Sequence, residues 1–183
     1  MIRSVLIRSG LLAALALSLS ACMNRLMSTN SGSAEPTAQP QPGAACVEGY
    51  TRPDFARLQT DLSAARARWQ AAAISNYAYD FAQYALPVRF PAVRVTVSGG
   101  AVQGVALKAG EEGEPSAQAR ATVGDLFQNI ADALAYQQAQ PCPEIEGEYD
   151  VQDGHPTRLF SGTEEANVAD GEGEWNVTGF ERR

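Results

Sequence analysis

The sequence contains few residues that could support catalysis by histidine, cysteine or a metal ion. Its 183 residues include one histidine and three cysteines, and no two cysteines form a Cys-x-x-Cys pair. Neither Gly-x-Ser-x-Gly nor His-Glu-x-x-His occurs. The single histidine, His155, lies between Gly154 and Pro156 in a predicted turn, where we expect an exposed side chain. We therefore expect no catalytic residue, no metal, no cofactor and no enzymatic activity.

Positive charge is also scarce. The chain has 14 Lys and Arg residues against 21 Asp and Glu residues, which gives a formal net charge of −7. A nucleic-acid-binding protein needs clustered cations to neutralise phosphates, so this function is excluded. The same charge argues against electrostatic docking onto anionic lipids.

No hydrophobic run is long enough to cross ~30 Å of hydrocarbon as a helix. The longest, at residues 11–19, follows Arg3 and Arg8 and ends in the tetrapeptide "LSAC", with Cys22 last. This arrangement is typical of a secretory signal peptide. The tetrapeptide resembles the lipobox of bacterial lipoproteins, which implies cleavage after residue 21 and acylation of Cys22. The alternative is an ordinary signal peptide with a cysteine nearby by chance.

The lipobox reading predicts a lipid-anchored protein of the bacterial cell envelope. Met23 follows Cys22 and no aspartate does, which favours the outer membrane if the cell has two membranes. Cleavage would remove residues 1–21 with two arginines from a chain of net charge −7, leaving −9. The acyl chains on Cys22 would then provide the membrane attachment.

Residues 22–45 are rich in Ser, Thr, Gln, Pro and Ala and have no hydrophobic period, so we expect a disordered tether. Residues 46–183 have the size of one domain. If Cys22 carries lipid, Cys46 and Cys142 remain as an even pair in an oxidising compartment, where a disulfide is plausible. The alternative is two free thiols too far apart to join.

The pattern of the domain predicts an α+β fold. Apolar residues at three- and four-residue steps indicate helices near residues 54–74 and 121–138, the second with a capping box of Thr122 and Asp125. Alternating apolar residues indicate strands in between and afterwards, with hairpin turns at Gly99-Gly100 and Asp153-Gly154. The predicted order is α-β-β-β-α-β-β-β. We expect an antiparallel sheet of about five to six strands with both helices on one face.

Four acidic residues at every second position form the most unusual predicted surface: Glu144, Glu146, Glu148 and Asp150. On a strand they would project from one face. They could form a solvated face, a charged edge that resists pairing with other strands, or a docking surface for a basic envelope protein or peptide.

We therefore expect a non-enzymatic interaction or accessory domain. The alternative is a small-ligand carrier or an enzyme that uses an aromatic sheet surface formed by Tyr77, Tyr79, Tyr84 and Tyr149.

Several segments together resemble a bacterial secreted or lipid-anchored family, the domain of unknown function 6174 family. They are Trp69 before "NYAYDF", then "VRVTVSGGAV", "TVGDLFQNI", "YDVQDGHPTRL" and the closing "EWNVTGF" after Asp170. The resemblance covers about residues 58–180 and implies a compact envelope domain. It supplies no activity, because none is established for the family. Many members carry a close cysteine pair after the first strand. The segment "AQYALPVRF" lacks one, so the resemblance implies that Cys46 and Cys142 replace it.

Overall fold

We describe the domain from a computed structural model, which describes residues 45–166, 168 and 171–183. Its elements run α1 (Phe55–Ala72), β1 (Tyr77–Ala85), β2 (Val88–Arg89), β3 (Val93–Ser98), β4 (Ala101–Leu107), a 3₁₀ helix η1 (Ala117–Arg120), α2 (Val123–Gln138), β5 (Pro143–Tyr149), β6 (Pro156–Thr163) and β7 (Gly173–Arg182). The predicted signal peptide, Cys22 and all but Ala45 of the predicted tether lie outside the described residues. None of the described helices has both the length and the apolar character needed to span a bilayer.

All strands belong to one antiparallel sheet in the order β4-β3-β1-β7-β6-β5, with the short β2 paired to β1. Each predicted helix is therefore followed by its own group of consecutive strands, and the two groups join where β1 pairs with β7. The α+β class and the antiparallel sheet are confirmed. The described residues form seven strands rather than five to six, because β2 has only two residues and so shows no alternation in the sequence.

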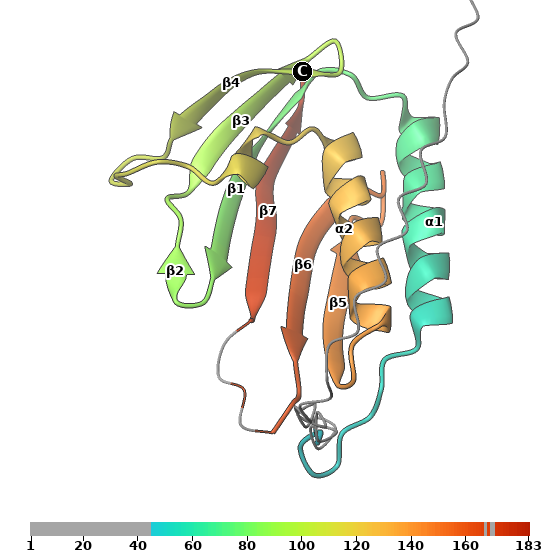
Figure 1. Ribbon diagram of the computed structural model, residues 1–183. Coiled ribbons are helices and arrows are strands. Elements are labelled where there is room, and N and C mark those ends of the chain that lie inside the picture. Colours follow the sequence, from blue (N-terminus) through green and yellow to red (C-terminus); the bar gives the residue numbers. More distant parts are fainter. Residues whose placement is uncertain (1–44, 167, 169–170) are drawn as a thin grey trace, which may run out of the picture. The chain divides into compact units, whose positions relative to one another are not determined.

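Both helices lie on one face of the sheet (Figure 1), α2 against β5 and β6, and α1 against α2 and β5. Helix α1 begins after Asp54, whose carboxylate accepts a hydrogen bond from the Arg57 backbone N–H at 3.0 Å. Helix α2 begins with the predicted capping box of Thr122 and Asp125. On the other sheet face, which we call the open face, the described residues place no helix.

The core lies between the helices and the sheet. It is built mainly from the apolar side chains that alternate along the strands and point toward the helices. Tyr77, Tyr79 and Phe81 of β1 are buried with the three valines of β3, which occupy every second position, and with Trp175 and Val177 of β7. The Tyr77 hydroxyl accepts a hydrogen bond from the Val123 backbone N–H at 2.9 Å, and the Tyr79 hydroxyl donates to the Ala121 carbonyl. These two tyrosines therefore fix the start of α2 over the sheet.

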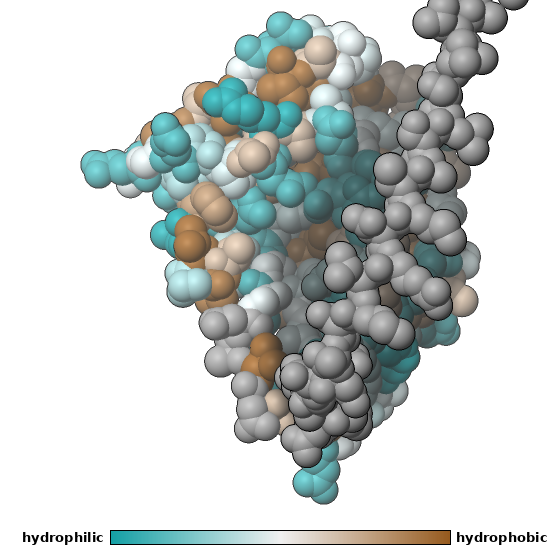
Figure 2. All heavy atoms as spheres, in the orientation of Figure 1, coloured by the Kyte–Doolittle hydropathy of each residue, from teal (hydrophilic) through white to brown (hydrophobic). Residues whose placement is uncertain are grey.

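Apolar residues are exposed on the visible surface near β2. Figure 2 shows them in brown in this region, where Leu86 and Val88 are about half exposed (46% and 50%). Hydrophilic residues shown in teal are visible both in the region of β3 and β4 and on the side where Figure 1 shows α1. The functional-site candidate lies where α1 borders β5.

Candidate functional site

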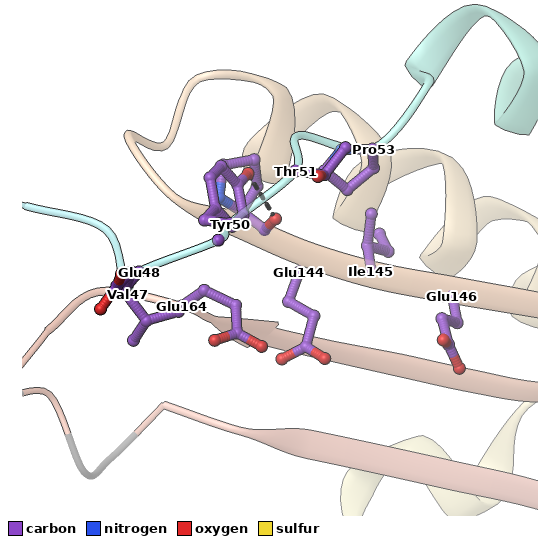
Figure 3. Close-up of a pocket in the computed structure, with 11 residues that line it drawn as sticks. Val47, Glu48, Tyr50, Thr51, Pro53, Glu144, Ile145, Glu146 and Glu164 are labelled. Carbon is purple, nitrogen blue, oxygen red and sulfur yellow. Dashed lines mark hydrogen bonds between the residues drawn. The ribbon is translucent and has the colours of Figure 1, made fainter.

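Two adjoining hollows follow the outer edge of β5 and share Pro53, Ile145 and Glu146. The first, about 450 Å³, lies between residues 47–51 and the start of β5, and it includes Glu164 (Figure 3). The second, about 400 Å³, lies between the first turns of α1 and β5 as far as Glu148. We call the two together the edge groove. It brings three of the four predicted acidic residues, Glu144, Glu146 and Glu148, to one concave site.

The segment that precedes α1 forms one wall of the edge groove and is held in place at several points. Cys46 and Cys142 form a disulfide, which confirms the predicted pairing. The Tyr50 hydroxyl donates a hydrogen bond to the Pro143 carbonyl at 2.9 Å. Arg52 donates to the carbonyls of Gln138 and Gln140, at 2.6 and 3.0 Å, at the end of α2. A cation at a helix C-terminus satisfies carbonyls that have no partner within the helix.

The floor of the edge groove is a strand edge with unpaired backbone groups. Among the described strands, β5 is the last of the sheet and pairs only with β6. The Glu164 N–H donates to the Cys142 carbonyl at 2.9 Å, whereas the Pro143 carbonyl faces the other way, toward Tyr50. Because successive residues of a strand direct their backbone groups to opposite edges, Ile145 and Gly147 direct theirs into the groove. A strand edge of this kind is a template for pairing with another chain.

The acidic side chains of β5 lie on the open face, beside this edge. The Arg158 guanidinium of β6 donates to Glu146 at 2.8 Å and Glu148 at 3.2 Å, and to Glu174 of β7 at 2.8 Å. Three carboxylates therefore share one cation. The fourth predicted acid does not belong to this group: β5 ends at Tyr149, and Asp150 accepts hydrogen bonds from the Gln152 and Asp153 backbone N–H groups. The prediction of a four-residue face was wrong at this position because the chain has already entered the turn.

The electrostatics of the edge groove show an excess of negative charge. Burial raises the pKa of Glu144 above its usual value, and the nearby carboxylates of Glu164, Glu172 and Glu146 raise it further. Figure 3 shows Glu144 and Glu164 side by side at the groove. By contrast, the hydrogen bond from Arg158 lowers the pKa of Glu174. A positively charged ligand beside Glu144 would relieve the repulsion that raises its pKa.

The helix wall of the edge groove adds both charge and apolar surface. This wall is lined by the charged residues Asp54, Arg57 and Asp61 and by the apolar residues Leu58 and Ile145. Arg57 Nε lies 3.8 Å from Asp61 Oδ2. Arg57 is the one cationic side chain among the described residues that line either hollow. The groove therefore combines a small apolar floor with mainly acidic sides.

His155 is buried, with 6% of its surface exposed, so the prediction of an exposed turn residue was wrong. Its ring stacks on Phe180 with 4.1 Å between ring centroids, and its Nδ1 lies 2.5 Å from an Asp153 carboxylate oxygen. Arg182 donates to the other Asp153 oxygen at 3.0 Å. Although burial alone would raise the pKa of Asp153, the hydrogen bonds from His155 and Arg182 hold it below its usual value.

This turn contains the residues that come nearest to a metal site in the described part of the chain: Asp150, Asp153 and His155. Four of their ligand atoms already make hydrogen bonds: Asp150 Oδ1 accepts from backbone N–H groups of the turn, and the two Asp153 oxygens bind His155 Nδ1 and Arg182. A metal ion held by these atoms would have to break these hydrogen bonds. The cluster therefore serves to fix the turn.

The predicted aromatic surface is not formed. Tyr77 and Tyr79 are buried in the core, whereas Tyr84 donates a hydrogen bond to Glu174 at 3.2 Å on the open face. Tyr149 stacks on Phe127 of α2, and burial raises its pKa to about 12. The four tyrosines thus divide between the two faces of the sheet and share no site.

Sequence reasoning missed the residues that close the edge groove. Tyr50 and Pro143 are 93 positions apart, and Glu164 comes from a third segment. No local period or motif links them. The predicted disulfide was the one signal available, because it joins Cys46 to the residue that precedes β5.

Comparison with known proteins identifies a family but no function. No curated protein and no solved structure matches the chain. A model of a family of unknown function, DUF6174, matches residues 61–182, which is most of the folded domain and more than half of the chain. The match covers α1 from Asp61 onward, both hairpins and the buried His155 turn. The chain therefore belongs to the DUF6174 family of unknown function.

Proposed function

We propose that this protein is a lipid-anchored domain of the bacterial cell envelope that binds a partner protein through the edge groove, without catalysis. The observation that carries the proposal is the edge groove itself, where unpaired backbone of Ile145 and Gly147 lies beside an acidic surface. Anchoring through acyl chains on Cys22 rests on the sequence. In a cell with two membranes, the residue after Cys22 favours the outer membrane.

A non-catalytic role is supported by the chemistry of the described residues around the edge groove. Its polar side chains are mainly carboxylates, with Tyr50 bonded to Pro143 and Arg57 paired with Asp61. The imidazole of His155 lies in a separate turn, where its Nδ1 is hydrogen-bonded to Asp153. No nucleophile is paired with a general base at the groove, which is the arrangement that nucleophilic catalysis needs.

The anchor is tested by labelling cells with radioactive palmitate. The wild-type chain should incorporate label and the Cys22→Ala variant should not, because the cysteine sulfur is the acceptor of the diacylglycerol group. Cys142→Ala is the matched control, since it also removes one cysteine and should keep the label. Equal labelling of wild type and Cys22→Ala would refute the anchor.

Partner binding at the edge groove is tested by photocrosslinking in living cells. A photoreactive amino acid replaces Arg57, which lines the groove, or Glu112, which is exposed in a loop elsewhere. Expected is a discrete crosslinked protein from position 57 and none from position 112. The same product at both positions, or none at position 57, would contradict partner binding through this groove.

A further inference from the structure

We propose that the partner of the edge groove is an extended polypeptide segment rich in Lys or Arg, which joins the sheet as an additional strand beside β5. This inference rests on the proposed function and specifies the partner and the geometry of binding. It depends on three features: the unpaired backbone of β5, the charge on its open-face side, and the lining of the hollow between β5 and α1.

The unpaired backbone supplies sequence-independent hydrogen bonds. Ile145 and Gly147 each direct one N–H and one carbonyl away from β6, and no backbone partner is found for them among the described residues. Tyr50 occupies the Pro143 carbonyl and so marks one end of the free edge. A segment of about four to five residues can pair with this length of edge. Such main-chain pairing is how an extended peptide adds a strand to a sheet.

The side chains of an added strand would meet two different surfaces. Because side chains alternate between the faces of a sheet, every second residue would lie beside Glu144, Glu146 and Glu148 on the open face. The residues between them would lie on the helix side, over Leu58 and Ile145 and beside Asp61. The open-face positions select Lys or Arg, and the helix-side positions accept small apolar side chains.

The charge distribution also disfavours the other occupants of a sheet edge. A second copy paired through β5 would place Glu146 and Glu148 of both chains next to each other, and like charges on adjacent strands repel. An anionic membrane surface would be repelled by the same acids. A cationic segment would instead relieve the repulsion among Glu144, Glu164 and Glu172.

The test uses the full-length chain purified in detergent and a fluorescent peptide probe of sequence KVKVKVK, with its ends blocked. Binding is measured by fluorescence anisotropy. Two further probes carry backbone N-methyl groups, either on the valines or on the lysines. In an added strand only one of these two sets of N–H groups faces β5. One methylated probe should therefore bind about tenfold more weakly than the parent while the other binds like it.

Protein variants test the charges separately. The double variant Glu146→Gln/Glu148→Gln should bind the parent probe about three- to tenfold more weakly. The control Glu112→Gln/Glu114→Gln changes the net charge equally in an exposed loop and should bind like the wild type. Hydrogen exchange of the Ile145 and Gly147 amides should slow when the probe binds, and this measurement does not depend on any substitution.

Three results would overturn the proposal: no binding of the parent probe, equal binding of all three probes, or unchanged exchange at Ile145 and Gly147. A groove-specific crosslink in cells together with any of these results would retain the proposed function and reject strand addition. Loss of the crosslink would reject the proposed function itself.

Discussion

Replacing Gly154 by alanine should destabilise the fold far more than the same replacement at Gly110. The two glycines have nearly equal positive φ angles, 80° and 83°. A Cβ at Gly154 would lie 2.3 Å from the Ala65 carbonyl oxygen in α1, whereas a Cβ at Gly110 would meet nothing within 4 Å. Both variants incur about 1–2 kcal/mol for an L-residue in the left-handed region. Gly154→Ala adds about 1–3 kcal/mol, because the turn must move away from α1.

The free energies of unfolding of both variants and the wild type are measured by urea titration with the disulfide intact. Gly110→Ala should lower the free energy of unfolding by about 1–2 kcal/mol, and Gly154→Ala by about 2–5 kcal/mol. Equal losses in the two variants would refute the close approach of the turn to α1. Both glycine-to-alanine changes reduce the conformational entropy of the unfolded chain to a similar extent, so this effect cancels when the two variants are compared.

Three further predictions concern the disulfide, a buried tyrosine and the buried turn. The double variant Cys46→Ala/Cys142→Ala should lose about 4–5 kcal/mol in urea titration, because a cross-link spanning 96 positions restricts the unfolded chain; a loss below 1 kcal/mol would contradict this. Tyr79→Phe should lose about 1–3 kcal/mol, because the buried Ala121 carbonyl loses its donor; unchanged thermal stability would contradict it. The pKa of Asp153 is lower in the folded than in the unfolded chain, so its contribution is present above about pH 4 and is lost as the pH falls further. Asp153→Asn should therefore be less stable at pH 7 and lose less stability between pH 5 and 2 than the wild type; parallel curves would contradict this.

The features that the sequence predicted correctly are those set by neighbours along the chain. The cap of α2 depends on Thr122 and Asp125, three residues apart, and both are visible in the sequence. The buried face of β3 follows from strict alternation, and alternation also places Tyr77, Tyr79 and Phe81 of β1 on one buried face. These local rules were enough to predict the α+β class and both helices on one face.

The features that were missed depend on contacts between distant segments. His155 follows a turn glycine, and its burial results from Phe180 at the far end of β7 and from the approach of Gly154 to α1. Asp150 continues the acidic alternation in sequence, but a β-bulge at the end of β5 turns the chain before it. The wall of the edge groove depends on Tyr50 and Pro143, which no local pattern connects.

From the sequence, the acidic residues of β5 could either protect a strand edge or form a docking surface. In the structure these two roles are compatible. An exposed strand edge is protected when it repels the same edge of another copy of the chain. Glu146 and Glu148 provide this repulsion, because they and Glu174 share a single guanidinium, that of Arg158, and so retain excess negative charge. The same excess charge attracts a cationic strand, and residues 47–53 and α1 border hollows of about 450 and 400 Å³ beside Ile145 and Gly147. Specificity would then arise from repulsion of the wrong partner as much as from attraction of the right one. Replacing the acids with neutral residues should accordingly have two effects at once: weaker binding of basic segments and stronger self-association through β5.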